Sequence, residues 1–176
     1  MKMRNMKKCL CLCLGAMLLF SASMTTKAAT QSGTYPTRAG VILVTPDAYK
    51  NLIPTGHAAI VLNQSRVVES LSSGVAIRSN NWRSTKKIIY GVTVNATNNT
   101  QDARAAQWCV NQVGKPYNWN YFDINTRKKF YCSHLVWAAY NDLYGINMNT
   151  STFGKAIHPM ELVNSSRTSI VYRYSK

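Results

Sequence analysis

The chain has 176 residues and a formal net charge of +15, from 21 Lys and Arg against six Asp and Glu. Such a length holds one domain with a sizeable core. The positive excess fits an anionic environment, such as a bacterial wall or membrane surface, or serves only to keep the protein soluble. Because the basic residues are scattered and no aromatic-basic motif appears, nucleic acid is not an expected partner.

Residues 1–28 have the order of a secretory signal peptide: a basic start, an apolar run over 9–20, and a small polar stretch ending in Thr26-Lys27-Ala28. We expect cleavage after Ala28, and the apolar run is too short to span a membrane. Five basic residues leave with this leader, so the domain over 29–176 keeps 16 basic and six acidic residues, a net +10. The sequence therefore predicts a secreted protein, with attachment to the cell wall left open.

The first half of this domain reads as β-structure. Apolar or alternating runs are separated by short polar turns, which is typical of consecutive antiparallel strands. The spacing predicts a meander with strands over 41–45, 58–62, 66–70, 75–78 and 87–94.

The second half reads as helical. Thr100 is expected to cap a helix that ends at Gly114, and a second helix begins at Cys132 and ends at Gly145. Between them lies a loop, residues 117–122, whose aromatic side chains we expect to seal the core in preference to covering a lipid chain. Pro159 opens a short helix, and a closing strand follows over 169–174. Strands first and helices second predict an α+β fold.

Cys132 is the first candidate for chemistry. It stands at the start of its helix, where free backbone N–H groups and the helix dipole favour a thiolate. The alternative is a packed core cysteine. Cys109, in the middle of the preceding helix, is interpreted as a small buried residue, and no disulfide with Cys132 is expected.

A nucleophilic cysteine needs a base, and three histidines are available. His134 lies two residues along the same helix and projects about 200° away from Cys132, so we expect it to be exposed or at an interface. His158, before Pro159, reads as a loop residue. His57 directly precedes the apolar strand over 58–62, and the ends of strands are common positions for functional sites. His57 is therefore the expected base.

Glu69 is the candidate for orienting that base. If a three-residue turn over 63–65 joins the strands predicted over 58–62 and 66–70, residue 62 pairs with residue 66. Glu69 then lies diagonal to His57 on the same face of the sheet. A two-residue or four-residue turn would break this parity. The alternative is an edge-strand charge that faces water.

These residues follow a known order. The segments Gly56-His57-Ala58-Ala59-Ile60-Val61, Val67-Val68-Glu69, Gly114-Lys115-Pro116-Tyr117 and Phe130-Tyr131-Cys132-Ser133 resemble the circularly permuted, papain-like proteins of the NlpC superfamily. The chain looks most like the YiiX/YebB-like cysteine hydrolases, a group with secreted YycO-like members. The resemblance implies a papain-like antiparallel sheet with the cysteine helix packed on it. It also implies Cys132 as nucleophile, His57 as base and Glu69 as third member.

The resulting hypothesis is a hydrolase that cleaves an amide or ester through a thioester on Cys132. The N–H of Cys132 is the expected oxyanion donor, Tyr131 is a second candidate, and Tyr117 is a candidate for the substrate site. Expected substrates are cell-wall peptides, with a lipid acyl group, as in the related lecithin:retinol acyltransferases, as the alternative. A catalytically silent wall-binding module is the other alternative. No metal or cofactor is expected, since ligand spacings and phosphate loops are absent from the sequence.

Overall fold

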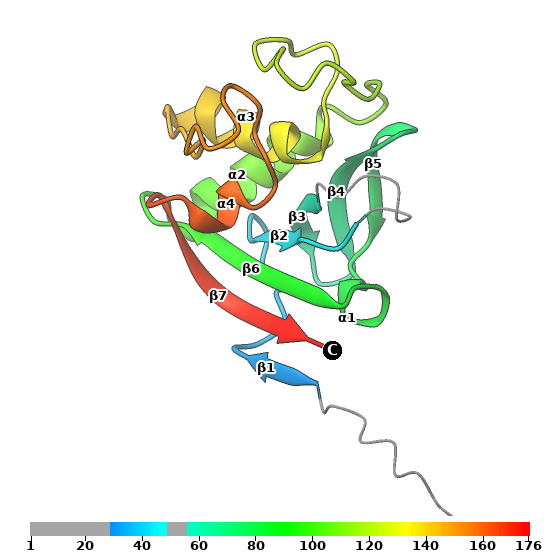
Figure 1. The fold of residues 1–176 in the computed structure, drawn as a ribbon, viewed down its shortest axis with the longest axis vertical. Helices are drawn as coiled ribbons and strands as arrows, with labels where there is room; N and C mark the ends of the chain where they lie inside the picture. Colours follow the sequence, from blue (N-terminus) through cyan, green and yellow to red (C-terminus); the bar gives the residue numbers. More distant parts are fainter. Residues whose placement is uncertain (1–28, 49–55) are drawn as a thin grey trace, which may run out of the picture.

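Seven antiparallel strands form one curved sheet in the order β1-β7-β6-β2-β3-β4-β5 in the computed structural model (Figure 1), which describes residues 29–48 and 56–176. The expected signal peptide lies outside these residues. The strands are β1 Thr30–Ser32, β2 Ile42–Thr45, β3 His57–Asn63, β4 Arg66–Leu71, β5 Gly74–Ser79, β6 Ile88–Val94 and β7 Thr168–Ser175. The helices are α1 Trp82–Thr85, α2 Asn99–Val110, α3 Cys132–Tyr144 and α4 Glu161–Asn164. The predicted α+β class is confirmed.

The strands do not form a simple meander, and that part of the prediction is wrong. Strands β2 to β5 follow one another in the sheet, but β6 crosses back to pair with β2, and β7 pairs beyond it. All four residues of β2 are buried. A buried strand needs hydrogen-bond partners along both edges, and β6 supplies the second edge. Strand β5 remains an edge, with its last three residues exposed.

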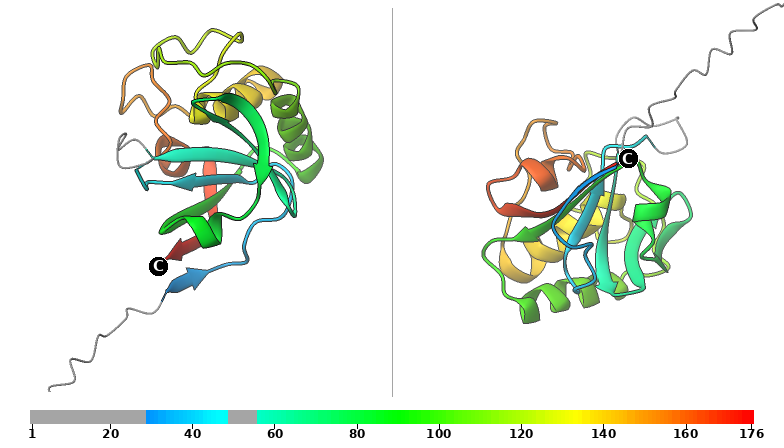
Figure 2. Two further views of the ribbon diagram at one scale, coloured as in Figure 1. Left: turned by 90° about the vertical axis from the view of Figure 1, so that its right-hand side faces the viewer. Right: turned by 90° about the horizontal axis from the view of Figure 1, so that it is seen from below.

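Helices α2 and α3 cover one face of the sheet, as the ribbons in Figures 1 and 2 show. Ile42 and Val44 of β2 point to these helices and join the larger apolar cluster. The alternate residues Val41 and Leu43 point to the opposite face, where a smaller cluster gathers around Trp82 of α1. No helix within residues 29–48 and 56–176 combines the length and apolar character needed to cross a bilayer.

The β3–β4 hairpin sets the position of two candidate residues. Asn63 pairs with Arg66 across a two-residue turn, so the predicted three-residue turn is wrong. However, the register shifts between Val61 and Asn63, and the extra residue is Leu62. This bulge restores the parity that a two-residue turn alone would break. Ala59 therefore pairs with Glu69, and Glu69 lies on the same sheet face as His57.

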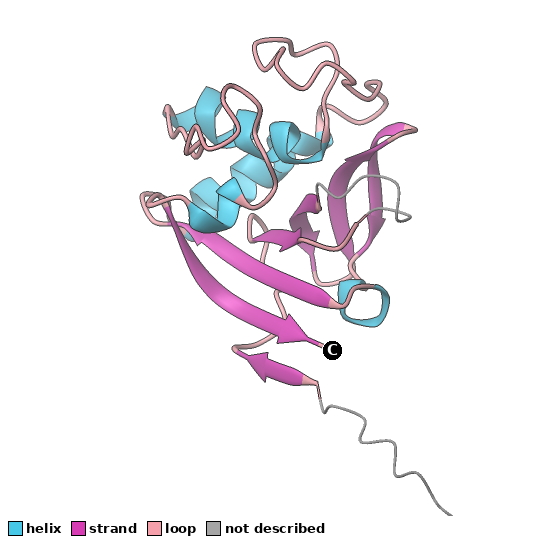
Figure 3. Cartoon of the chain, viewed as in Figure 1, coloured by secondary structure: helices cyan, strands magenta, loops and turns pink. Residues whose placement is uncertain are grey.

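Capping residues define the ends of the two long helices, α2 and α3. Asn98, not Thr100, caps α2, because Asn98 and Gln101 exchange hydrogen bonds in a complete capping box. Helix α3 ends at Gly145 as predicted, with the left-handed φ of 68° that glycine accepts readily. Figure 3 shows how much irregular chain separates α2 from α3, and this segment forms one wall of the site described below.

A buried acidic residue of α2, Asp102, connects α3 with the segment just before β2. The carboxylate of Asp102 accepts hydrogen bonds from Arg38 (2.6 Å) and from the Thr97 hydroxyl (2.6 Å). The Tyr140 hydroxyl of α3 lies between this carboxylate (3.2 Å) and the Gly40 carbonyl oxygen (2.8 Å). Gly40 has a φ of 84°, and a β-carbon there would lie 2.4 Å from that of Asp102. Close backbone packing thus anchors the helix that begins with Cys132.

Replacing this anchor should destabilise the domain. We predict that Asp102→Ala lowers the free energy of unfolding by about 3 kcal/mol, because buried donors lose their charged acceptor. Asp142→Ala, which removes the half-exposed pair with Arg127, is the control and should lower it by less than about 1 kcal/mol. Urea denaturation of both variants measures the difference. Equal losses would contradict the anchoring role.

Candidate active site

Cys132 is the first residue of α3, with Tyr131 as its N-cap. No side chain caps this helix start, so backbone N–H groups of the first turn remain available. Hydrogen bonding from the backbone N–H groups of Ala58, on β3, and of Ser133 helps to lower the pKa of the Cys132 thiol. The sulfur thus lies where the end of β3 meets the positive end of the helix dipole, a position that stabilises a thiolate.

His57 and Glu69 are in direct contact. The Nε2–H of His57 donates to Oε2 of Glu69 at 2.7 Å, and both side chains are about nine-tenths buried. Glu69 therefore does not face water as an edge-strand charge. The indole of Trp82 stacks on the imidazole, with ring centroids 5.5 Å apart and planes 26° apart. The ring of His57 is held on one side by a carboxylate and on its face by an aromatic side chain.

His57 and Cys132 shift each other's pKa, through their charges and through hydrogen bonding between the two side chains. Since Nε2 is occupied by Glu69, Nδ1 is the nitrogen left for the sulfur. Burial by itself lowers the pKa of His57, but the charges of Cys132 and Glu69 outweigh it and raise the pKa to about 9. Burial raises the pKa of Cys132, but the His57 imidazolium and the two N–H groups bring it below its usual value. The arrangement favours a thiolate–imidazolium pair.

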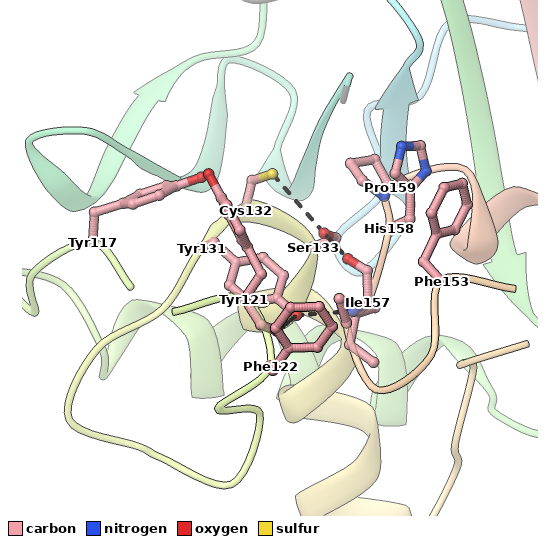
Figure 4. Close-up of a pocket in the computed structure, with 11 residues that line it drawn as sticks. Tyr117, Tyr121, Phe122, Tyr131, Cys132, Ser133, Phe153, Ile157, His158 and Pro159 are labelled. Carbon is pink, nitrogen blue, oxygen red and sulfur yellow. Dashed lines mark hydrogen bonds between the residues drawn. The ribbon is translucent and has the colours of Figure 1, made fainter. Parts of the chain in front are cut away.

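The two tyrosines singled out in the sequence take different positions. The Tyr131 hydroxyl donates to the Tyr121 carbonyl (3.1 Å) and accepts from the Ile157 N–H (2.8 Å), so it joins two loops. Its proton is not directed at the sulfur. Tyr117 extends toward Cys132 (Figure 4). Burial, the Cys132 charge and Tyr121 together raise the pKa of Tyr117, which therefore remains a protonated donor near the sulfur.

A largely apolar pocket of about 250 Å³ opens beside Cys132 (Figure 4). Its walls come from the loop between α2 and α3 and from the loop before α4. The expectation that the aromatic loop seals the core holds only in part: Tyr117 and Tyr121 pack against the core, whereas Trp119 and Phe122 are 60% and 67% exposed. An isolated parallel bridge between Tyr117 and Phe130 joins the loop to the residues just before Cys132. The pocket is lined by Tyr117, Tyr121, Phe122, Tyr131, Cys132, Ser133, Phe153, Ala156, Ile157, His158 and Pro159.

Buried hydrogen bonds hold the second wall. The Glu161 carboxylate accepts the N–H groups of Thr150 (3.2 Å), Thr152 (3.1 Å) and His158 (2.8 Å). The ring of His158 stacks on Phe153, with centroids 4.1 Å apart. His158 is thus a loop residue, as predicted, and its ring belongs to the pocket rim.

His134 is buried within the domain, so the expectation of an exposed or interfacial residue is wrong. Its Nε2–H donates to the Ile124 carbonyl at 2.9 Å, because the loop before α3 folds back over this face of the helix. Burial and then the Arg127 cation lower the pKa of His134 to about 4, so the ring is neutral near pH 7. His134 fastens the loop that carries the pocket aromatics.

Two further observations concern metals and thiols. Within residues 29–48 and 56–176, no three His, Cys, Asp or Glu side chains are grouped so that they could hold a metal ion. Cys109 and Cys132 are both free thiols. Burial raises the pKa of Cys109, so this second thiol is protonated and serves as an internal reference for Cys132.

The pKa shifts predict how Cys132 reacts with iodoacetamide. Its alkylation rate should reach a plateau well below pH 8.5, the ordinary thiol range. His57→Gln should move the titration above that range, because burial then acts without the opposing imidazolium. Mass spectrometry of Cys132 and Cys109 peptides follows both thiols in one experiment. An identical pH profile in wild type and His57→Gln would contradict the coupling.

The chain resembles proteins already known. The family described as permuted papain-like amidase enzymes, YaeF/YiiX, C92 family, matches residues 44–171. YycO, an uncharacterised protein of Bacillus subtilis (strain 168), is 30% identical over 144 residues, which cover 77% of this chain and 56% of YycO. The chain thus spans just over half the length of that relative.

The fold agrees with a solved structure. A crystal structure described as the metalloprotein YiiX from Escherichia coli O157:H7 matches with a TM-score of 0.61 and 16% identity, over 77% of this chain and 96% of that one. The similarity shows a shared papain-like fold. With the family match covering more than half of the sequence, this chain belongs to the YaeF/YiiX-type permuted papain-like amidases of the C92 family.

Proposed function

We propose that the protein is a cysteine hydrolase in which Cys132 is the nucleophile, His57 the general base and acid, and Glu69 the residue that orients His57. The family supports an amidase of the papain-like type. The observation that carries the assignment is the buried His57–Glu69 contact of 2.7 Å, together with the coupling that raises the pKa of His57 and lowers that of Cys132. This arrangement supports the roles of nucleophile, base and orienting acceptor for the three side chains.

Acylation begins when the Cys132 thiolate attacks the carbonyl carbon of the substrate amide. A C–S bond forms, and the carbonyl oxygen takes up negative charge near the N–H of Cys132 at the helix start. The Tyr117 hydroxyl, which points toward Cys132 (Figure 4), is the candidate for a second donor to this charge. The C–N bond then breaks as imidazolium His57 gives its proton to the leaving nitrogen. A thioester on Cys132 and a free amine result.

Deacylation uses the same groups in the reverse direction. Neutral His57 takes a proton from water, and the hydroxide attacks the thioester carbonyl carbon. The C–S bond breaks, sulfur leaves as the thiolate, and the carboxylic acid is released. The imidazolium–thiolate pair is thereby restored for the next cycle.

The acyl half of the substrate binds in the aromatic pocket, because Cys132, whose sulfur bonds to the acyl carbon, lines that pocket. This supports an apolar acyl group. We propose peptide amides of the bacterial wall as the substrates. The expected export and the net +10 of residues 29–176 support action at an anionic surface outside the cell.

A second candidate is hydrolysis or transfer of a lipid acyl group. Three exposed aromatic side chains near the pocket favour it: Trp119, Phe122 and Phe153, the last 48% exposed. Contiguous exposed apolar side chains around a cavity are typical of contact with an apolar ligand or surface. A silent binding module, by contrast, would have no use for a thiolate–imidazolium pair buried at the pocket wall.

Trapping the thioester tests the proposal. Incubation with activated aryl esters of hydrophobic and peptidyl acids should add one acyl group to Cys132, detected by intact mass and peptide mapping. Cys132→Ala should abolish this acylation, while Cys109→Ala, the matched loss of the buried thiol, should retain it. A Cys132→Ala protein that hydrolyses the esters as fast as wild type would rule out the mechanism.

A further inference from the structure

A second cavity, of about 270 Å³, borders the histidine side of the site. His57 and Glu69 line this cavity and Cys132 does not, whereas Cys132 lines the aromatic pocket and His57 does not. We name the second cavity the histidine-side cavity. It is lined by His57, Glu69, Leu71, Arg78, Ser79, Asn81, Trp82, Thr85 and Lys86. The sulfur and the imidazole thus each face their own pocket.

The chemistry of the proposed function assigns the two pockets to two halves of the substrate. The acyl carbon bonds to the sulfur, so the acyl group lies on the cysteine side. The His57 imidazolium transfers its proton to the leaving nitrogen. A proton donor must lie within hydrogen-bond distance of the atom that it protonates. The leaving amine therefore lies on the side of His57, at the histidine-side cavity.

This cavity is cationic where the aromatic pocket is apolar. Arg78, from the exposed end of β5, and Lys86, just after α1, line it. Its one carboxylate, that of Glu69, accepts the hydrogen bond of His57. The ion pairs within residues 29–48 and 56–176 are Arg38–Asp102, His57–Glu69 and Arg127–Asp142. Neither Arg78 nor Lys86 belongs to one of these pairs.

The position of Lys86 relative to the imidazole is defined by stacking. Its ammonium lies 5.4 Å from the centre of the Trp82 ring, and the same ring stacks on His57. The ammonium and the imidazole thus contact the same indole. Arg78 and Lys86 line the cavity that His57 also lines, so an anionic group on the leaving amine would meet these two cations there.

We propose that the histidine-side cavity binds a leaving amine that carries a carboxylate, held by Arg78 and Lys86. The planar guanidinium fork matches a carboxylate and forms charge-assisted hydrogen bonds with it. The substrate class is then an N-acyl amino acid, including the last residue of a peptide with a free C-terminus. This inference rests on the proposed function and specifies its substrate.

The test uses the reverse of the leaving step, which needs no knowledge of the natural acyl group. Acyl-Cys132 is formed from an activated aryl ester of a hydrophobic acid and offered an amine. The amine attacks the thioester carbonyl, a C–N bond forms, the C–S bond breaks, and His57 takes the amine proton. Alanine and alaninamide are compared at equal concentrations of unprotonated amine, and the acylated products are measured by mass spectrometry.

Wild type should acylate alanine at least about tenfold faster than alaninamide, the effect expected for charge-assisted hydrogen bonds to the carboxylate. Arg78→Gln and Lys86→Gln should each move this ratio toward one. Arg104→Gln, the same loss of charge at an exposed position of α2 that lines neither cavity, should leave the ratio unchanged. Because the readout is a ratio of two acceptors, a general loss of activity does not imitate the effect.

The outcomes separate the two proposals. If no acyl group appears on Cys132, the proposed function is wrong and the subsite falls with it. If the acyl-enzyme forms but wild type treats alanine and alaninamide alike, the carboxylate subsite alone is wrong. A preference that both Arg78→Gln and Lys86→Gln leave intact would likewise overturn the assignment to these two residues.

Discussion

The hydrogen bond between His57 and Glu69 is the interaction on which the rest of the site depends. Burial alone would leave the imidazole neutral, and a neutral imidazole cannot hold a thiolate beside it. The Cys132 thiolate makes the largest contribution against this burial, and the Glu69 carboxylate adds to it while it fixes the ring. Three groups that are each unfavourable as isolated buried charges thus stabilise one another. The two-residue turn between β3 and β4 would by itself place Glu69 on the wrong face of the sheet, and the bulge at Leu62 corrects this.

The position of the sulfur depends on a second set of contacts, all made by neutral groups around the start of α3. The Ser70 hydroxyl of β4 donates to the Phe130 carbonyl at 2.7 Å, two residues before Cys132. The Ser133 hydroxyl donates to the carbonyl of Ile157 on the opposite pocket wall. Tyr140, deeper in the same helix, reaches the backbone of Gly40. Strand, loop and helix therefore converge on the cysteine, and such support from rigid elements keeps reacting groups at productive distances.

Local patterns predicted most of the secondary structure, since apolar runs and turn residues are local signals. They predicted both hairpins from β3 to β5 and the limits of α3 closely. The pairing of β6 with β2 could not be predicted this way, because it depends on which buried edge lacks a partner. The proximity of His57 and Glu69 was predictable from side-chain parity, although the turn that produces it was assigned the wrong length.

The surroundings of the candidate site were harder to predict. Trp82 lies in a polar stretch without apolar periodicity, so nothing local marks it as the residue that stacks on His57. His134 projects away from Cys132, as helical geometry predicts, but a loop from elsewhere in the chain covers it. The loop that carries Trp119 and Phe122 is likewise joined through Tyr117 to Phe130, a residue far from it in local sequence pattern. In each case the deciding contact is made by a segment that the local sequence does not specify.

An NMR titration of the His57 ring measures whether His57 and Cys132 form one electrostatic pair. The spectrum of His57→Gln assigns the resonance among the three histidines of the chain. We expect a His57 pKa of about 9 in the wild-type protein. In Cys132→Ser the pKa should fall, because the thiolate charge is removed while the burial remains. A His57 pKa that is the same in both proteins would contradict the pair and the mechanism built on it.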